Sequence, residues 1–203
     1  MNSQTRRLSI AGPAGEIEVA IDEPAGVRGV AVLCHPHPLH GGTMDNKVVQ
    51  TLARACVQQG YRAVRFNFRG IGASQGSWDE GRGEVDDALA VVAAQREGTL
   101  PLLLGGFSFG GYVATQAAAR TAGVERLLLV APAVVNFVAA PVSQATLVVQ
   151  GEADDVVPLA AVLDWARPQA LPVTVVPGAG HFFHGQLPLL KQLIVAALPR
   201  HLS

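Results

Sequence analysis

The chain alternates between two patterns of apolar residues. Short runs of Val, Leu and Ile are typical of buried strands in a parallel sheet, and longer stretches with apolar residues at helical spacing are typical of helices that cover such a sheet. Two early runs on either side of Gly12-Pro13-Ala14-Gly15 predict an antiparallel hairpin at the edge of the sheet. The expected strands are 5–10, 16–21, 30–34, 62–68, 102–104, 127–131, 146–150 and 173–176, and the expected helices are 46–59, 83–97, 109–120, 159–166 and 188–198.

This order predicts an α/β fold with a mostly parallel, twisted sheet of about seven or eight strands and helices on both of its faces. The length of 203 residues suits one domain with a sizeable core. No internal repeat and no interdomain linker interrupts the alternation. We therefore expect a single domain over residues 1–203.

Composition narrows the range of partners. Only 15% of the residues are charged and the net charge is −1, which leaves no field for holding a nucleic acid or an anionic membrane surface. The apolar stretch 127–142 is interrupted by two prolines and an asparagine, and residues 1–10 lack the apolar run of a secretory signal. Two cysteines, Cys34 and Cys56, are too few for a disulfide scaffold. We therefore expect a cytoplasmic protein that acts on a small molecule, and the low charge is compatible with a homodimer.

The most informative segment is Gly106-Phe107-Ser108-Phe109-Gly110, which lies between an expected strand and an expected helix. A serine at the apex of so sharp a turn requires small neighbours, because larger side chains would collide with nearby backbone. The turn would raise the Ser108 hydroxyl out of the sheet toward the amino end of the helix. The pattern alone is weak in a chain with 22 glycines, but its strand–turn–helix context makes Ser108 a candidate nucleophile.

A serine hydroxyl is a poor nucleophile at neutral pH, so it requires a base and a group that orients the base. Two later segments, 151–158 and 178–181, begin directly after expected strands and contain carboxylates and a histidine. The carboxyl ends of parallel strands share one edge of the sheet, where ligands bind in open α/β folds. Ser108, Asp154 and His181 are therefore expected to meet at that edge.

Together these motifs resemble the α/β-hydrolase superfamily over nearly all of the chain, and they are most similar to small bacterial serine hydrolases of the dienelactone-hydrolase and carboxylesterase type. Dienelactone hydrolases proper have a cysteine at the nucleophile position. Ser108 occupies that position here, which implies esterase or thioesterase chemistry instead. The further motifs that carry the resemblance are His35-Pro36-His37-Pro38, Arg69-Gly70-Ile71-Gly72-Ala73-Ser74, Val157-Pro158 and Gly180-His181.

The resemblance implies that Ser108 attacks a small carboxylic ester or thioester and forms an acyl-enzyme. His181 would accept and return the proton, and Asp154 would orient the imidazole. Asp154 fits the Gly-x-x-Asp pattern of the family and is favoured over the rival acid Asp155. His181 directly follows a glycine, as the family's base does, and is favoured over His184. No cofactor and no metal is implied.

A developing oxyanion requires two N–H donors. One is expected to be the backbone of Phe109, the residue after the nucleophile. The other should come from the loop after strand 30–34, where two prolines have no N–H, so that His37 is the natural donor and Leu39 the next. The segment His40-Gly41-Gly42 begins late after the strand and is a minor alternative.

The sequence leaves little room for a lid over this site. In larger relatives a cap enters between the strand after the nucleophile helix and the strand that delivers the acid, but here only the segment from 131 to 146 is available, which is too short for a helical cap. We expect an open site without a cap domain. Trp78, Phe137, Phe182 and Phe183 are candidates to line its mouth.

Two other interpretations stay open. The segment from His35 to His40 matches the His-x-His-x-Asp-His zinc motif of metallo-β-lactamase-like proteins, except that Leu39 replaces the acid and that the next histidine is His181. A metallohydrolase using His35, His37 and His40 is therefore the weaker alternative, and the imidazoles of His35 and His37 could equally hold the loop by hydrogen bonds. The other alternative is a non-catalytic binding protein with a hydrolase fold, although all three reactive groups are present.

Overall fold

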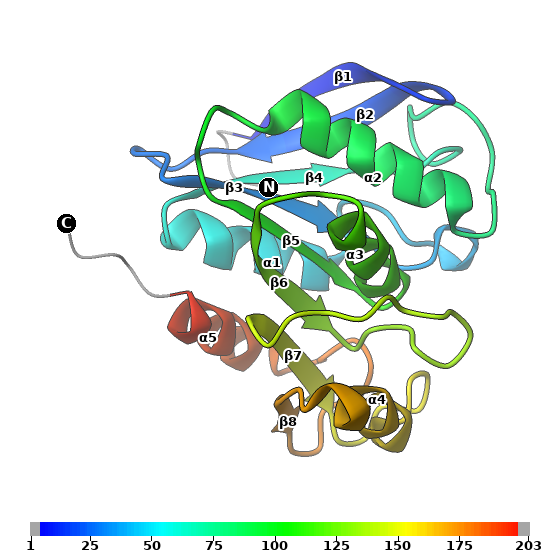
Figure 1. The fold of residues 1–203 in the computed structure, drawn as a ribbon, viewed down its shortest axis with the longest axis vertical. Coiled ribbons are helices and arrows are strands. Elements are labelled where there is room, and N and C mark those ends of the chain that lie inside the picture. The colour runs from blue at the N-terminus through cyan, green and yellow to red at the C-terminus, as the bar shows by residue number, and fades with distance from the viewer. Residues whose placement is uncertain (1–4, 199–203) are drawn as a thin grey trace.

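The computed structural model describes residues 5–198. In this part of the chain, eight strands form one sheet in the order β1-β2-β4-β3-β5-β6-β7-β8 (Figure 1). β2 runs antiparallel to both β1 and β4, and all other neighbouring strands are parallel. The strands are β1 (Arg6–Gly12), β2 (Gly15–Asp22), β3 (Gly29–Cys34), β4 (Tyr61–Phe66), β5 (Leu102–Phe107), β6 (Val124–Val130), β7 (Thr146–Gly151) and β8 (Val173–Val176).

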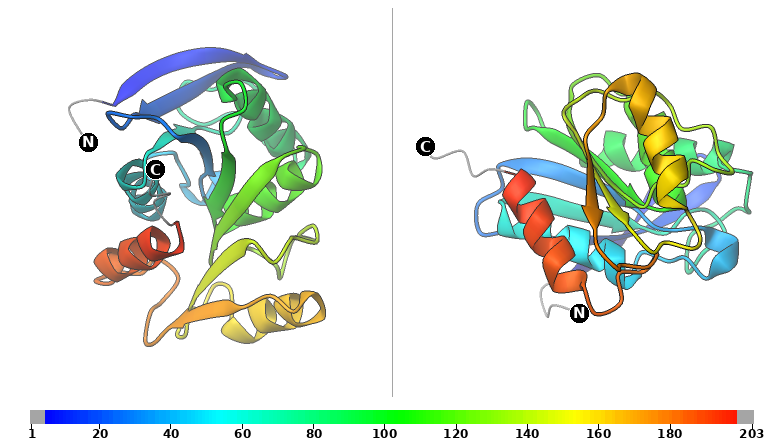
Figure 2. Two further views of the ribbon diagram at one scale, coloured as in Figure 1. Left: turned by 60° about the vertical axis from the view of Figure 1, so that its left-hand side comes forward. Right: turned by 90° about the horizontal axis from the view of Figure 1, so that it is seen from below.

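Helices cover both faces of the sheet, as Figure 2 shows. α1 (Lys47–Gln58) and α5 (Leu187–Ala197) lie on one face. α2 (Arg82–Gln95), α3 (Phe109–Ala119) and α4 (Leu159–Ala166) lie on the other, and the short 3-10 helices η1 (Pro38–His40) and η2 (Arg167–Gln169) complete the order. The predicted α/β-hydrolase fold, with its mostly parallel sheet and its antiparallel hairpin at one edge, is confirmed.

The prediction for β5 was too short. The sequence pattern predicts a strand over Leu102–Leu104 that ends at Gly105-Gly106, whereas the structure continues it through both glycines to Phe107. A Cβ atom at Gly105 would lie 2.8 Å from the carbonyl oxygen of Leu128. The glycine therefore does not break the strand but lets it approach β6 closely. The other expected elements are present, with boundaries that differ by a few residues.

Both faces of the sheet carry a buried apolar layer. Phe66, Phe68 and Phe109 are fully buried on the face covered by α2, α3 and α4. Because β3 and β5 are buried on both faces, their sequences are continuous apolar runs without alternation. Cys34 and Cys56 are buried free thiols, and burial raises the pKa of each, as expected for inert core residues.

A buried ion pair fixes the connection from β4 to α2. The Asp87 carboxylate accepts hydrogen bonds from Arg69 through its backbone N–H at 3.0 Å, its Nε at 3.0 Å and its Nη2 at 2.8 Å. One turn earlier, the buried Glu84 carboxylate accepts from the N–H groups of Asp79 and Gly81 at the start of α2. Both buried carboxylates therefore have hydrogen-bond donors, as buried polar groups generally do.

The connection between β6 and β7 contains no lid. Residues 131–145 form neither a helix nor a strand, which agrees with the expectation of a fold without a cap domain. Within residues 5–198, no helix is both long enough and apolar enough to cross a membrane.

The buried pair of Arg69 and Asp87 is expected to be important for stability. Asp87→Ala would leave the guanidinium, whose side chain is 12% exposed, without a carboxylate, and should lower the free energy of unfolding by about 3 kcal/mol. Urea denaturation measures this loss. The matched control is Asp86→Ala, which removes the pair with Arg120, where both side chains are 53% exposed, and should cost several times less. Equal losses in the two variants would contradict the assignment.

Candidate active site

The turn between β5 and α3 holds Ser108 in an unusual backbone conformation. Its φ is 56° and its ψ is −119°, a left-handed region that residues other than glycine rarely adopt. Hydrogen bonds hold the turn, because the Ser108 N–H donates to Val130 O at 2.9 Å and the Ser108 carbonyl accepts from Gly111 N at 2.8 Å and Ala133 N at 3.1 Å. The hydroxyl thus projects from a fixed position at the carboxyl edge of the sheet.

The two glycines of the Gly-x-Ser-x-Gly segment are required by close backbone contacts. A Cβ atom at Gly106 would lie 2.2 Å from the carbonyl oxygen of Gly110. A Cβ atom at Gly110 would lie 2.2 Å from the carbonyl oxygen of Cys34 and 2.6 Å from that of His35. The start of α3 therefore lies directly against the loop that follows β3.

The structure brings Ser108, Asp154 and His181 into one hydrogen-bonded chain. The His181 Nε2 atom lies 3.1 Å from Ser108 Oγ, and its Nδ1 atom lies 2.8 Å from Asp154 Oδ2. All three residues are buried, with Ser108 the most exposed at 8%. The serine comes from the end of β5, the carboxylate from the loop after β7 and the imidazole from the loop after β8. The predicted meeting of the three residues at one sheet edge is what the geometry shows.

The surroundings of Asp154 keep its carboxylate ionised. Burial acts to raise its pKa, but hydrogen bonds from His181 and from the N–H groups of Val157 and Val156 outweigh that effect and hold the pKa below its ordinary value. Asp154 Oδ1 accepts both backbone donors, at 2.8 Å and 2.9 Å. The remaining oxygen, Oδ2, faces the imidazole.

Gln150, at the end of β7, contacts the Asp154 carboxylate, and the sequence pattern did not predict this contact. Its side chain is fully buried, and its Nε2 atom donates to Asp154 Oδ2 at 3.0 Å and to Val157 O at 2.8 Å. The oxygen that meets His181 therefore accepts a second hydrogen bond. A polar residue within the otherwise apolar run after Thr146 was the signal that could have indicated it.

The rival residues lie apart from this chain of hydrogen bonds. Asp155 and His184 are exposed. Glu152 is also exposed, and its carboxylate accepts from the backbone N–H of Gly178 at 2.9 Å. In the part of the chain that the structure describes, none of the three makes a hydrogen bond to Ser108 or His181.

The structure distinguishes the expected oxyanion donors from their alternatives. Among residues 5–198, the N–H groups of His37 and Phe109 have no acceptor, and the two side-chain rings lie 5.1 Å apart. The alternative donors are engaged, because Leu39 N donates to His37 Nδ1 at 3.2 Å and Gly41 N and Gly42 N donate to backbone carbonyls of the same loop. The geometry thus favours the pair that the sequence suggested.

His35, His37 and His40 do not assemble a metal site. His35 is fully buried, its Nδ1 lies 2.6 Å from Pro36 O, and its Nε2 accepts from Phe68 N at 3.1 Å. Burial lowers the pKa of His35 to about 4, so the ring is neutral and both nitrogens are occupied. Among the described residues, no group of three or more His, Cys, Asp or Glu side chains could hold a metal ion. His35 is a structural residue of the loop.

Aromatic side chains pack against His37 and His181, with one correction to the expectation. The His37 ring packs against Trp78 at 4.6 Å and Phe137 at 6.0 Å, and the Phe182 ring lies 5.1 Å from that of His181. Phe183 is fully buried in the layer under α1 and α5 and does not line the mouth. The sequence could not distinguish which of the two adjacent phenylalanines faces inward.

Comparison with known proteins identifies the family. Residues 28–145 match the family described as "Serine aminopeptidase, S33". An uncharacterized protein from Rickettsia prowazekii is 33% identical over 190 residues, which cover 85% of this chain and 79% of that protein.

Two solved structures are similar over nearly the whole chain. An alpha-beta serine hydrolase homologue from Coxiella burnetii is 43% identical, with a TM-score of 0.85, and the match covers 96% of this chain and 97% of the other. A serine hydrolase without a lid from Xanthomonas campestris is 40% identical, with a TM-score of 0.88 and coverage of 98% and 95%. Sequence and fold agree, so this chain belongs to the α/β serine hydrolases of the S33 serine aminopeptidase family, and like the Xanthomonas protein it has no lid between β6 and β7.

Proposed function

We propose that this protein is a serine hydrolase that cleaves small carboxylic esters or thioesters through an acyl-enzyme. The single observation that supports this most strongly is the imidazole of His181, which lies within hydrogen-bond distance of both Ser108 and Asp154. A base that is itself oriented by a carboxylate is what a serine hydroxyl requires to act as a nucleophile.

In the proposed reaction, Ser108 Oγ attacks the acyl carbon while its proton moves to His181 Nε2. The tetrahedral intermediate then expels the alcohol or thiol, which takes that proton, and leaves the acyl group on Ser108. A water molecule repeats the sequence, with His181 as base and then as acid, and releases the carboxylic acid. Asp154 fixes the tautomer and stabilises the positive charge that His181 carries in each half of the reaction.

The negative charge of the intermediate would be held by the N–H groups of His37 and Phe109. The Phe109 N–H lies at the amino end of α3, where the helix dipole favours an anion. The His37 loop is stiffened by two prolines and by the bonds that His40 N and Gly42 N donate to His37 O. Donors fixed before the substrate arrives need no reorganisation when the charge develops.

The rim of the site favours an apolar substrate. Five of the exposed large apolar side chains follow the carboxyl ends of β3, β6, β7 and β8, at the same sheet edge as Ser108; they are Leu39, Val135, Val138, Val156 and Phe182. Apolar groups of a substrate would be partly removed from water there. Because no lid closes over them, we propose a small uncharged acyl substrate. The two buried free thiols are in keeping with action in the cytoplasm.

The nucleophile can be tested by labelling with a fluorophosphonate probe. The wild-type protein should form one covalent adduct, located at Ser108 by peptide mass spectrometry, and Ser108→Ala should form none. Ser143→Ala is the matched control, since this exposed serine lies on the lidless connection, and it should be labelled as the wild type is. A labelled Ser108→Ala variant would refute the assignment, and an unreactive wild-type protein would favour the non-catalytic alternative.

The His37 N–H can be tested by removing it without changing the local φ. The φ of His37 is −54°, which a proline ring accommodates, so His37→Pro should fold and lose the donor. We expect kcat for p-nitrophenyl acetate to fall by about 10²- to 10³-fold. His37→Ala loses the same imidazole but keeps the N–H, so its loss should be much smaller. Equal losses in two variants that unfold at the wild-type temperature would exclude the donor role.

Gln150 should act by positioning and polarising Asp154. Gln150→Met removes the N–H donated to Asp154 Oδ2, which makes the carboxylate a stronger proton acceptor and raises its pKa. Because the acid limb of the kcat/KM profile reports ionisations of the free enzyme, a higher pKa of Asp154, which contacts His181 through Oδ2, should move that limb to higher pH.

The matched control for this pH profile is Gln59→Met. Gln59 is also a buried glutamine, its Nε2 donates to Val195 O at 3.0 Å, and its Oε1, like that of Gln150, has no partner among the described residues. Its loss should affect stability but leave the profile in place. A profile that does not move in Gln150→Met, or that moves equally in Gln59→Met, would show that the amide has only a packing role.

A further inference from the structure

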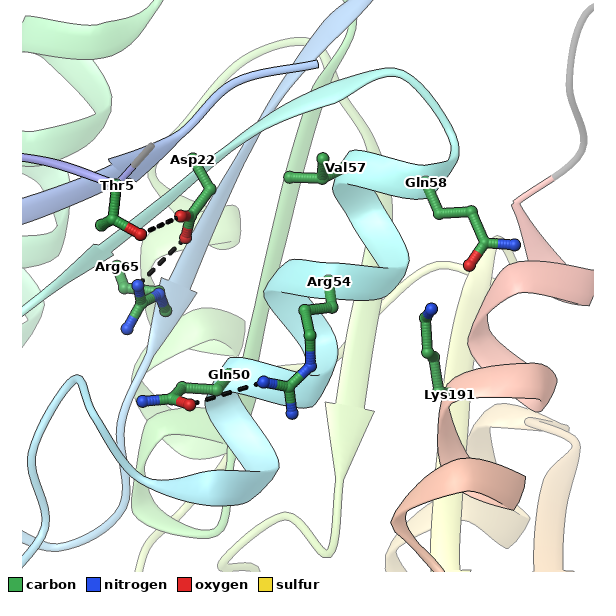
Figure 3. A pocket seen from close by; sticks show the side chains of 8 residues that line it. All are labelled: Thr5, Asp22, Gln50, Arg54, Val57, Gln58, Arg65 and Lys191. Atoms are coloured by element: carbon green, nitrogen blue, oxygen red, sulfur yellow. Dashed lines mark hydrogen bonds and ion pairs between the residues drawn. The ribbon is translucent and has the colours of Figure 1, made fainter. Parts of the chain in front are cut away.

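A cavity lies on the face of the sheet that α1 and α5 cover. It has a volume of about 260 Å³ and is lined by side chains of α1, of α5, of β2 and of β4 (Figure 3). None of its lining residues belongs to the chain of Ser108, His181 and Asp154. The volume is just below the range of sites that bind drug-sized molecules, so the cavity suits a smaller ligand.

Positive charge dominates the lining of this cavity. Three cationic side chains line it, those of Arg54, Arg65 and Lys191. The lining contains one carboxylate, that of Asp22. Arg65 is the buried member, at 3% exposure, and is already compensated, since its Nη atoms lie 3.0 Å from Asp22 Oδ2 and 3.1 Å from Asp45 Oδ1. The other two cations therefore determine the net charge of the space.

Among residues 5–198, neither Arg54 nor Lys191 forms an ion pair with an acidic side chain. Arg54 makes hydrogen bonds only to uncharged groups, at 3.5 Å to Gln50 Oε1 and at 3.1 Å to Thr51 Oγ1. Lys191 makes no hydrogen bond and no ion pair within residues 5–198. Within the described part of the chain, two cations from different helices thus border one cavity while its one carboxylate, Asp22, is paired with Arg65, an arrangement that favours an anion between them.

The rest of the lining adds neutral donors and a small apolar surface. The amide of Gln58 lies near the tip of Lys191 in Figure 3, and Val57 supplies an apolar wall. Amide donors beside a guanidinium and an ammonium group suit the oxygens of a phosphate or a carboxylate, and the guanidinium can bind either in a bidentate manner.

We propose that this cavity binds a small anion with a phosphate or carboxylate group, held between Arg54 of α1 and Lys191 of α5. The inference is independent of the proposed hydrolase function, because it uses none of the catalytic groups. α1 follows the loop that contains His37, and α5 follows the loop that contains His181. A bound anion would connect two helices whose preceding loops both reach the candidate active site.

The test measures binding to the full chain at constant ionic strength, adjusted with chloride, by isothermal titration calorimetry and thermal unfolding. Inorganic phosphate and succinate are the two probes, and they distinguish the phosphate source from the carboxylate source. We expect saturable binding of at least one of them with one site per chain. At a concentration tenfold above Kd, the Tm should rise by about 4 °C.

Substitutions distinguish the proposed site from general charge effects. Arg54→Gln and Lys191→Gln should each weaken binding at least about tenfold, as expected for a lost charge-assisted hydrogen bond. The matched control is Lys47→Gln, which removes one charge from an exposed residue of α1 that does not line the cavity, and it should bind as the wild type does.

Two results would overturn the proposal. One is the absence of saturable binding for both probes. The other is an equal loss of affinity in Lys47→Gln and in the two cavity variants, which would indicate a diffuse charge effect. Because the readout does not involve catalysis, neither result bears on Ser108, and an inactive nucleophile would leave the anion site intact.

Discussion

The backbone conformation of Ser108 is the constraint on which the rest of the site depends. A serine at a φ of 56° costs on the order of 1–3 kcal/mol, and the turn keeps this strain because it cannot relax. Gly106 and Gly110 bring backbone atoms too close for any larger residue, and Val130 O holds the Ser108 N–H. The same turn fixes the position of the hydroxyl and the direction of the Phe109 N–H, so one local geometry places the nucleophile and one oxyanion donor together.

Much of the fold and the central part of the site could be predicted from the sequence, because they depend on local patterns and one global rule. Apolar periodicity located the strands and helices, and the glycines around Ser108 located the turn. The rule that parallel strands end at a common edge then placed segments 151–158 and 178–181 beside it, and the resemblance to the α/β hydrolases favoured Asp154 and His181 within them. What this reasoning could not supply are facts about side-chain packing.

Three particular misses illustrate that limit. The role of Gln150 depends on a rotamer that turns its amide to a carboxylate four positions onward, and the burial of Phe183 rather than Phe182 depends on how one loop is folded. The cavity bordered by Arg54 and Lys191 involves segments far apart in the sequence, so no local pattern indicates it. Each of these features exists only once the layers of the fold are packed.

This fold has no lid, so other segments must keep water from the hydrogen bonds between Ser108, His181 and Asp154. All three members of this chain are buried: the side chain of Asp154 is 0% exposed, that of His181 is 4% exposed, and Ser108 is 8% exposed. The loops after β7 and β8 therefore exclude water from the acid end, where charge–dipole interactions are strongest in a dry environment.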